Sequence, residues 1–141
     1  ERDAWTQLEA WAGPRGLLDN PTVYQVFGRN NPTPMQQPRL RGYEFLVSIP
    51  EDYVLEPGVA EVTFSGGLYA VVRSKGIPAM VLNYEAAFCW IQNSAEYAPD
   101  YPEGYDFEHM PGLELENNLD PHHEDENTML IDAYIPIKRR K

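Results

Sequence analysis

The chain has 141 residues, of which 43 % are hydrophobic, and its formal net charge at pH 7 is −11. A chain of this length can bury one sizeable hydrophobic core, so we expect a single domain over residues 1–141. The excess of acidic residues argues against a surface that binds nucleic-acid phosphates. The basic residues 138–141 are typical of a solvated terminus, so no direct nucleic-acid contact is expected through this segment.

The cysteine content and the hydrophobic runs indicate the compartment. Cys89 is the single cysteine, which rules out a disulfide within the chain and favours a reducing environment. The apolar runs are shorter than the roughly 18 residues that cross a bilayer, and the N-terminus lacks the order of a signal peptide. We therefore expect a cytoplasmic protein without a membrane partner. Because the chain begins at Glu1 rather than at methionine, we interpret it as a piece of a longer protein.

The first predicted elements are a helix and two strands. An amphipathic helix is predicted over residues 3–12, since Asp3 can cap it and Gly13-Pro14 ends it. Strand-forming residues predict a strand at 22–28, and three prolines make 29–38 a loop. Residues 42–50 alternate as a strand. One face of that strand carries Tyr43, Phe45, Val47 and Ile49, and the other carries Glu44, Leu46 and Ser48.

The later elements begin after a polar connection at 51–58. A strand bounded by glycines is predicted at 66–76, and a helix follows from 77 to 91, where apolar residues recur at three- and four-residue steps after Pro78. Residues 97–105 are predicted as a loop and 106–110 as a short extended piece. A polar segment follows it, through residues 117–118 and 122–126. The last strand is predicted at 129–137, with alternate residues from Met129 to Ile137 on one face.

Two parts of the chain share a pattern. Residues 5–12 and 84–91 both read aromatic, x, x, apolar, x, x, Trp, apolar, and residues 44–49 and 132–137 both begin with an acid and end with Ile. The order of the matches agrees, so we predict a duplication with halves at about 1–58 and 59–141. The second half has a strand before its helix, at 68–73. Its counterpart would lie upstream of Glu1, so the first strand is apparently absent from this chain.

One face of the predicted sheet carries acids and tyrosines. If both helices cover the apolar rows, the opposite face presents Glu44, Leu46, Tyr69, Glu108, Asp132 and Tyr134. Carboxylates and aromatic faces can receive a planar organic cation by charge pairing and cation–π contact. The alternative is that this face is merely solvated. Glu44 and Glu108 would repel each other if close, which raises one pKa and makes proton transfer conceivable.

Metal and cofactor motifs are weak. His122 and His123 precede three acidic residues, but a flexible acidic loop is favoured over a metal site because adjacent histidines there lack a fixed scaffold. No glycine-rich phosphate loop lies between a strand and a helix. We expect no metal and no cofactor.

Six motifs span nearly the whole chain. They are Ala4-Trp5-x-x-Leu8-x-x-Trp11-Ala12, Phe27-Gly28-x-Asn30-Asn31-Pro32-x-Pro34, Gly42-Tyr43-Glu44, Gly66-Gly67-Leu68-Tyr69-Ala70-Val71, Phe107-Glu108 and Asp132-x-Tyr134-Ile135-Pro136-Ile137. In this order and spacing the chain resembles the GyrI-like, or effector-binding, domain. That domain occurs at the C-terminus of AraC- and MerR-type bacterial transcription regulators and as stand-alone proteins.

The resemblance implies an α+β fold of two tandem βαββ units related by a pseudo-twofold axis, with an antiparallel sheet and two helices on one face. It also implies a cleft between the halves that binds hydrophobic, often cationic, small molecules. Glu108 matches the acid that usually pairs with the cation. Departures at Leu46, Tyr84 and Met110, where relatives often carry other aromatic residues, leave the ligand class open. The expected ligand-binding residues are Glu108, Glu44, Leu46, Tyr69, Trp90, Tyr134, Phe27 and Asn31.

Three functions are consistent with these residues. The first is a small-molecule-binding module, either the sensor of a transcription regulator or a stand-alone multidrug-binding protein without catalytic residues. The sequence contains no helix-turn-helix, so a regulator would need a DNA-binding domain fused upstream. The second is a hydrolase of electrophilic, cyclopropane-type compounds, in which Glu108 or Glu44 orients a water. The third is an acidic inhibitor or adaptor of a basic protein partner.

Overall fold

The computed structural model describes residues 2–31, 42–64, 66–106, 110, 112–117, 125 and 127–141. These residues form two α-helices, one short 3₁₀ helix and six strands. In chain order the elements are α1 (Arg2–Ala12), η1 (Gly13–Arg15), β1 (Val26–Asn30), β2 (Tyr43–Val47), β3 (Leu68–Lys75), α2 (Ile77–Asn93), β4 (Tyr97–Pro99), β5 (Leu115–Asn117) and β6 (Leu130–Arg139). All strand pairs are antiparallel, which confirms the predicted α+β class. Of the helices described, neither is long and apolar enough to cross a membrane.

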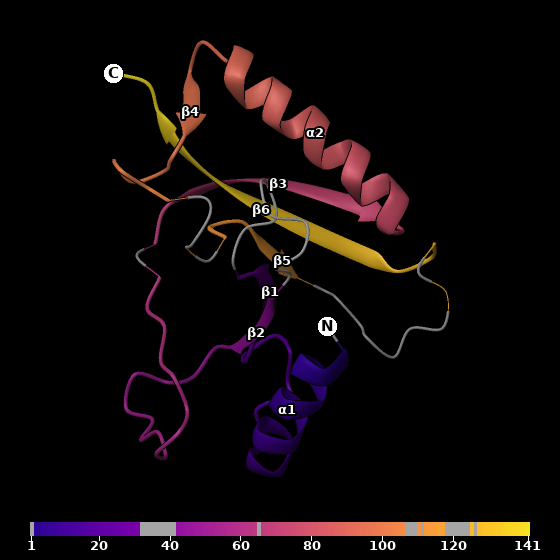
Figure 1. Cartoon of the computed structure of the whole chain (residues 1–141), viewed down its shortest axis with the longest axis vertical. Helices are drawn as coiled ribbons and strands as arrows, with labels where there is room; N and C mark the ends of the chain where they lie inside the picture. Colours follow the sequence, from indigo (N-terminus) through magenta and orange to yellow (C-terminus); the bar gives the residue numbers. More distant parts are fainter. Residues whose placement is uncertain are drawn as a thin grey trace.

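The strands lie in the order β2-β1-β5-β6-β3, and β4 pairs with the C-terminal end of β6. The β1–β5 pair in the middle joins the strands of the two halves of the chain. Figure 1 shows α2 lying along β3 and β6, and α1 beside β2, at the two ends of the sheet. Within the described residues β2 pairs with β1 alone, so its other side is a sheet edge.

Both helices cover the same face of the sheet. Phe45, Gly28, Glu116 and Ala133 are successive partners across β2, β1, β5 and β6, so they share one face. On α1, the ring of Trp5 meets Phe45 edge-on, with 5.2 Å between centroids. On α2, Ile91 packs against Ile135 and Ile137 of β6, which follow Ala133 at two-residue steps. This confirms the predicted placement of the two helices, and we call this side the helix face.

The core lies between α2 and β6. Ile91 of α2 packs with Ile135 and Ile137 of β6, and the partly buried residues around them are Ala70, Tyr84, Ala87, Phe88 and Tyr97. The alternate residues Met129, Ile131, Ala133, Ile135 and Ile137 are all 7 % exposed or less, because a strand turns every second side chain to the same face. The predicted apolar face of the last strand is therefore confirmed.

One predicted strand is shifted along the chain, and two observed strands were not predicted. The strand predicted at 22–28 begins at Val26, because the amides of Val23 and Tyr24 donate to the Asn20 carbonyl in a turn, and it continues to Asn30. Strand β4 forms within the predicted loop 97–105, where its last residue, a proline, is tolerated at the end of a short strand. Strand β5 forms where only a polar segment was expected. Most of the proline-rich loop, residues 107–109 and the His122-His123 run lie outside the described residues.

Candidate functional site

The sheet face opposite the helices, which we call the helix-free face, carries most of the predicted site residues. Leu46, Phe27, Asn117, Asp132 and Arg73 are successive partners across the strands and share this face. Glu44, Tyr69 and Tyr134 lie on the same face by two-residue steps. The rings of Phe27 and Tyr69 both meet Tyr134 edge-on, with centroid distances of 5.8 Å and 6.1 Å. The strands therefore bring these predicted residues together.

The carboxylates of the helix-free face are bound by arginines. The Glu44 carboxylate accepts a hydrogen bond from Nε of Arg29 at 2.8 Å and forms an ion pair with Nη2 of Arg29, also at 2.8 Å. The side-chain amide of Asn31 donates to the same carboxylate. Asp132 accepts two bonds of 2.7 Å from Arg73. The hydrogen bonds to Asp132 raise the pKa of Arg73. Because each acid already has a cationic partner, an incoming cation would have to compete with an arginine.

Burial on the helix-free face is uneven. Arg29, Leu115 and Asp132 are only 7 %, 6 % and 4 % exposed, so the alternative of a merely solvated face does not describe these positions. Two predicted residues are not part of this grouping. Trp90 lies on α2, over the other face of the sheet, and Glu108 lies outside the described residues.

A second group of acids and tyrosines lies on the helix face. The Tyr43 hydroxyl donates to Oε2 of Glu116 at 2.6 Å, which links β2 to β5 across β1. The Tyr101 hydroxyl donates to Glu114, which precedes β5. In addition to burial, the charges of both glutamates raise the pKa of Tyr84 of α2. We call Tyr43, Tyr84, Tyr101, Glu114 and Glu116 the acid–tyrosine cluster.

Burial and nearby carboxylates raise the pKa of two tyrosines of the acid–tyrosine cluster. Burial raises the pKa of Tyr84 far above its ordinary value, and the negative charge of Glu114 raises it further. Burial likewise raises the pKa of Tyr101, followed by its hydrogen bond to Glu114. Both phenols therefore stay protonated at ordinary pH, and Tyr101 donates to Glu114 as a neutral group.

Further aromatic rings contact the tyrosines of the cluster. Phe45 contacts both Trp5 of α1 and Tyr43, and the Tyr43–Phe45 centroids are 5.1 Å apart. Toward the other helix, the rings of Tyr84 and Phe88 are also 5.1 Å apart. The rings of Tyr101 and Tyr105 are stacked at 5.6 Å. Aromatic residues of β2, α2 and the segment before β5 thus contact tyrosines of the cluster, whose two carboxylates are half-buried.

Gly28 makes the Tyr43–Glu116 contact possible. A Cβ atom built on Gly28 would lie 2.0 Å from the Tyr43 hydroxyl oxygen and 2.6 Å from Cζ, so the tyrosine ring occupies the space of the missing side chain. Only glycine lets this ring cross β1 to reach β5.

Gly28→Ala is therefore expected to displace the Tyr43 ring and break its bond to Glu116. We expect a loss of about 1–3 kcal/mol in the free energy of unfolding, measured by urea denaturation. Tyr43→Phe removes only the hydroxyl and should cost about 1 kcal/mol. If Gly28→Ala in the Tyr43→Ala background is as harmful as in the wild type, the crossing ring is not the reason for glycine at this position.

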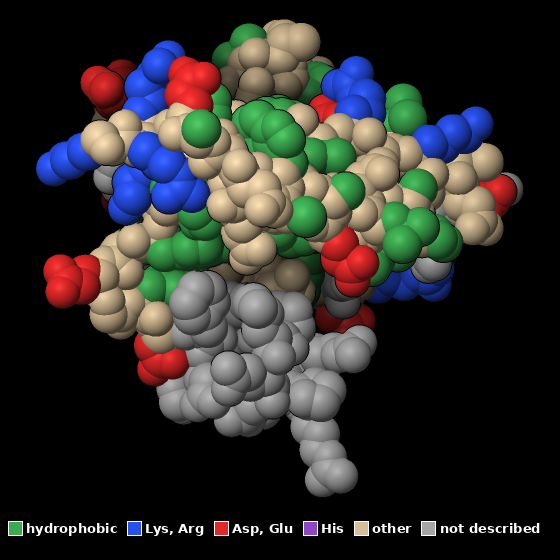
Figure 2. Space-filling view, turned by 90° about the horizontal axis from the view of Figure 1, so that it is seen from above, with side chains coloured by type: hydrophobic (Ala, Val, Ile, Leu, Met, Phe, Trp, Pro, Cys, Tyr) green, Lys and Arg blue, Asp and Glu red, His purple; other side chains and the backbone are tan. Residues whose placement is uncertain are grey.

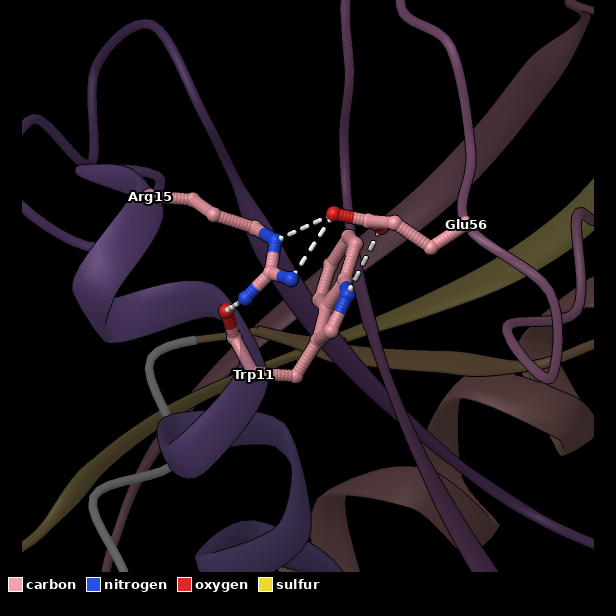
Figure 3. Close-up of polar contacts among 3 residues, drawn as sticks. All are labelled: Trp11, Arg15 and Glu56. Carbon is pink, nitrogen blue, oxygen red and sulfur yellow. Dashed lines mark hydrogen bonds and ion pairs between the residues drawn. The ribbon is translucent and has the colours of Figure 1, made fainter.

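A separate charged contact fixes Trp11 at the end of α1. Figure 3 shows Arg15 and Trp11 both reaching Glu56. Nη2 of Arg15 lies 2.7 Å from the carboxylate, and Nε1 of Trp11 donates to it at 3.2 Å. The Arg15 guanidinium also lies over the Trp11 ring, 5.1 Å from its centroid. These contacts anchor the segment after β2 to α1.

The hydrogen bond from Arg15 lowers the pKa of Glu56 below its ordinary value of 4.5. A lowered folded-state pKa means that this contact stabilises the fold above the unfolded-state pKa and is lost as the pH falls through the folded-state value. We expect the Trp contribution to the near-ultraviolet circular dichroism to change below pH 4.5 in the wild type. Glu56→Gln should remove that part of the pH profile, whereas Glu51→Gln, in the same segment, should retain it. Identical profiles for the two variants would contradict this role of Glu56.

Several residues of the acid–tyrosine cluster were not predicted as site residues. The sequence pattern places Tyr43 on the apolar row of its strand, and it places Glu114 and Glu116 in the polar segment after residue 110. The alternation Leu113-Glu114-Leu115-Glu116 is the signal that could have identified them, since it is the pattern of a half-buried strand. In the part of the chain that the structure describes, no group of three or more His, Cys, Asp or Glu side chains could hold a metal ion.

Comparison with known proteins gives a family. A family model described as "Cass2: Integron-associated effector binding protein" matches residues 16–137, which is most of the chain. No curated protein and no solved structure gives a significant match. The matched range includes strands β1 to β5, α2 and most of β6, and therefore both sheet faces described above. The chain thus belongs to the family of integron-associated effector binding proteins.

Proposed function

We propose that this chain binds a hydrophobic cationic small molecule at the acid–tyrosine cluster. The observation that carries the proposal is the pair of half-buried carboxylates, Glu114 and Glu116, each accepting a hydrogen bond from a tyrosine hydroxyl among aromatic rings. Membership in an effector-binding family supports small-molecule binding in general. The charge and shape of the ligand are inferred from the cluster itself.

The cluster suits a cation for electrostatic reasons. A hydrogen bond donated by a neutral phenol orients a carboxylate without adding a positive charge to it. Partial burial lowers the effective dielectric and strengthens the attraction of the acids for a cation. The faces of the flanking rings add cation–π contacts of about 0.5–2 kcal/mol each. The acid–tyrosine cluster therefore offers a cation both negative charge and aromatic faces.

The predicted residues of the helix-free face and Glu108 remain candidates for a ligand contact. Phe27, Tyr69 and Tyr134 offer rings there, with Leu46 beside them. Glu108, expected from the resemblance to be the cation partner, would add charge to whichever face it joins. A role in transcription would follow if a DNA-binding domain is fused upstream, and we propose the chain as the sensor in that arrangement.

A matched pair of ligands tests the proposal. N-methylacridinium carries a fixed positive charge on a planar ring, and acridine offers the same ring without the charge in mildly alkaline buffer. We expect the wild type to bind the cation at least about 10-fold more tightly in equilibrium dialysis, which corresponds to about 1.4 kcal/mol. Equal binding of the two compounds, or no binding of either, would overturn the proposal.

A further inference from the structure

The outer edge of β2 carries backbone groups that point away from the sheet. The amide of Ser48 donates to the Gln25 carbonyl at 2.9 Å, on the β1 side. Because bonded positions alternate along an antiparallel strand, the even-numbered residues of β2 face β1, and the amides of Phe45 and Val47 point to the other side. In the part of the chain that the structure describes, no strand pairs with that side. An edge of this kind can accept a further strand.

In the second half of the chain, β3 covers the corresponding edge. The predicted repeat matches residues 44–49 with 132–137, which makes β6 the counterpart of β2. The β1–β5 pair lies in the middle of the sheet, so β2 and β6 occupy equivalent places on either side of it. On the outer side of β6, β3 pairs along its whole length, Leu68–Lys75. The counterpart of β3 would therefore lie on the outer edge of β2.

Burial at the matched positions differs between the two halves. Three positions of β6 are buried, whereas the matched positions in and after β2 are only half-buried. The buried three are Ala133, Ile135 and Ile137, and the half-buried three are Phe45, Val47 and Ile49. Helix α2 contacts both β3 and β6, and Figure 2, which looks onto this side, shows hydrophobic side chains gathered there. Helix α1 contacts β2 and, among the described strands, no other (Figure 1).

We propose that the outer edge of β2 binds a strand of this protein's own chain that precedes Glu1 and is the counterpart of β3. The pairing of β3 with β6 specifies its pattern. In β3, three apolar residues at two-residue steps, Leu68, Ala70 and Val72, lie opposite the buried row of β6. The docked strand runs antiparallel to β2 and sets three such residues opposite the half-buried row, where they cover it beneath α1.

The connection between β3 and α2 indicates that the docked strand belongs to the same chain. β3 ends at Lys75 and α2 begins at Ile77, so a single residue joins them. By the same connection, the counterpart strand leads directly into α1. In the repeat, Tyr84 follows its match Trp5 by 79 positions, which sets the counterpart of Lys75 five residues before Glu1. A strand ending there needs no second molecule to reach the edge of β2.

Hydrogen–deuterium exchange, followed by NMR, tests this inference on two forms of the protein. One form begins at Glu1, and the other adds the about 20 residues that the gene encodes directly before it. We expect the added residues to include the alternating apolar run, and the amides of Phe45 and Val47 to exchange at least about 10-fold more slowly in the longer form. The amides of Glu44 and Leu46 face β1 in both forms and should change less. A third form, with the added residues in scrambled order, should exchange like the form that begins at Glu1.

Three results would overturn the inference. The first is a gene that encodes no alternating apolar run before Glu1. The second is equal exchange of the Phe45 and Val47 amides in the longer form and in the form that begins at Glu1. The third is protection of these two amides in the shorter form that rises with protein concentration, together with a dimer in sedimentation velocity, because a second copy would then cover the edge. Circular dichroism of each form confirms that it is folded.

Discussion

Replacing Gly76 by alanine is expected to destabilise the fold by roughly 3–5 kcal/mol. Gly76 begins α2 with φ of 86° and ψ of 151°, a backbone conformation that L side chains rarely adopt. Its amide donates to the Met129 carbonyl at 2.7 Å, and its carbonyl accepts from Met80. A Cβ atom at this position would lie 2.7 Å from the carbonyl oxygen of Asn127 and 2.9 Å from its Cα. Because these neighbours are backbone atoms, they cannot turn away as a side chain can.

Gly58→Ala is the matched control for this prediction. Gly58 also has a positive φ, 95°, but a Cβ atom there would meet nothing within 4 Å. Its alanine variant should therefore show only the backbone strain, about 1–2 kcal/mol. Urea unfolding of both variants separates strain from collision. If the two variants lose the same stability, the tight contact between Gly76 and Asn127 contributes nothing.

Glu114→Gln and Glu116→Gln are each expected to weaken binding of N-methylacridinium by roughly 10-fold, or about 1.4 kcal/mol. Each glutamine keeps an oxygen that can accept the tyrosine hydroxyl, so the fold is retained while the negative charge is lost. Binding of neutral acridine should change by less than about 3-fold. Isothermal titration calorimetry of both ligands measures the difference.

Three further variants, Glu85→Gln, Glu44→Gln and Glu108→Gln, show which negative charge attracts the cation. Glu85→Gln makes the same change on the outer side of α2 and should leave both affinities unchanged. Glu44→Gln tests the helix-free face, with a check of its thermal unfolding because Arg29 would lose its partner. If Glu44→Gln or Glu108→Gln removes the cation preference and the cluster variants do not, the ligand binds at the residues predicted from the sequence and not at the acid–tyrosine cluster.

The sequence predicted the elements whose periodicity extends over many residues. Strand β6 alternates over nine positions and α2 repeats apolar residues over four turns, so each element and its buried face could be identified before any contact was known. The short strands were harder to predict from the sequence. β4 and β5 have three residues each, and they are strands because they pair with β6, not because of their own composition.

The candidate site was harder to predict because it depends on contacts across strands. Parity alone placed Glu44 and Asp132 on the helix-free face, but it could not show that Arg29 and Arg73 bind them. The acid–tyrosine cluster requires that Tyr43 cross β1 at Gly28 and reach Glu116, 73 positions later in the chain. Such a contact follows from strand order and register, which the sequence pattern leaves open.

The most direct test of the proposed function is a thermodynamic cycle between ligand charge and protein charge. The ratio of dissociation constants for acridine and N-methylacridinium is measured by calorimetry on the wild type and on the double variant Glu114→Gln/Glu116→Gln. If these two carboxylates attract the cation, the ratio should fall from at least about 10 in the wild type to about 1 in the double variant. A ratio that stays unchanged in a folded double variant would contradict a cation site at the acid–tyrosine cluster.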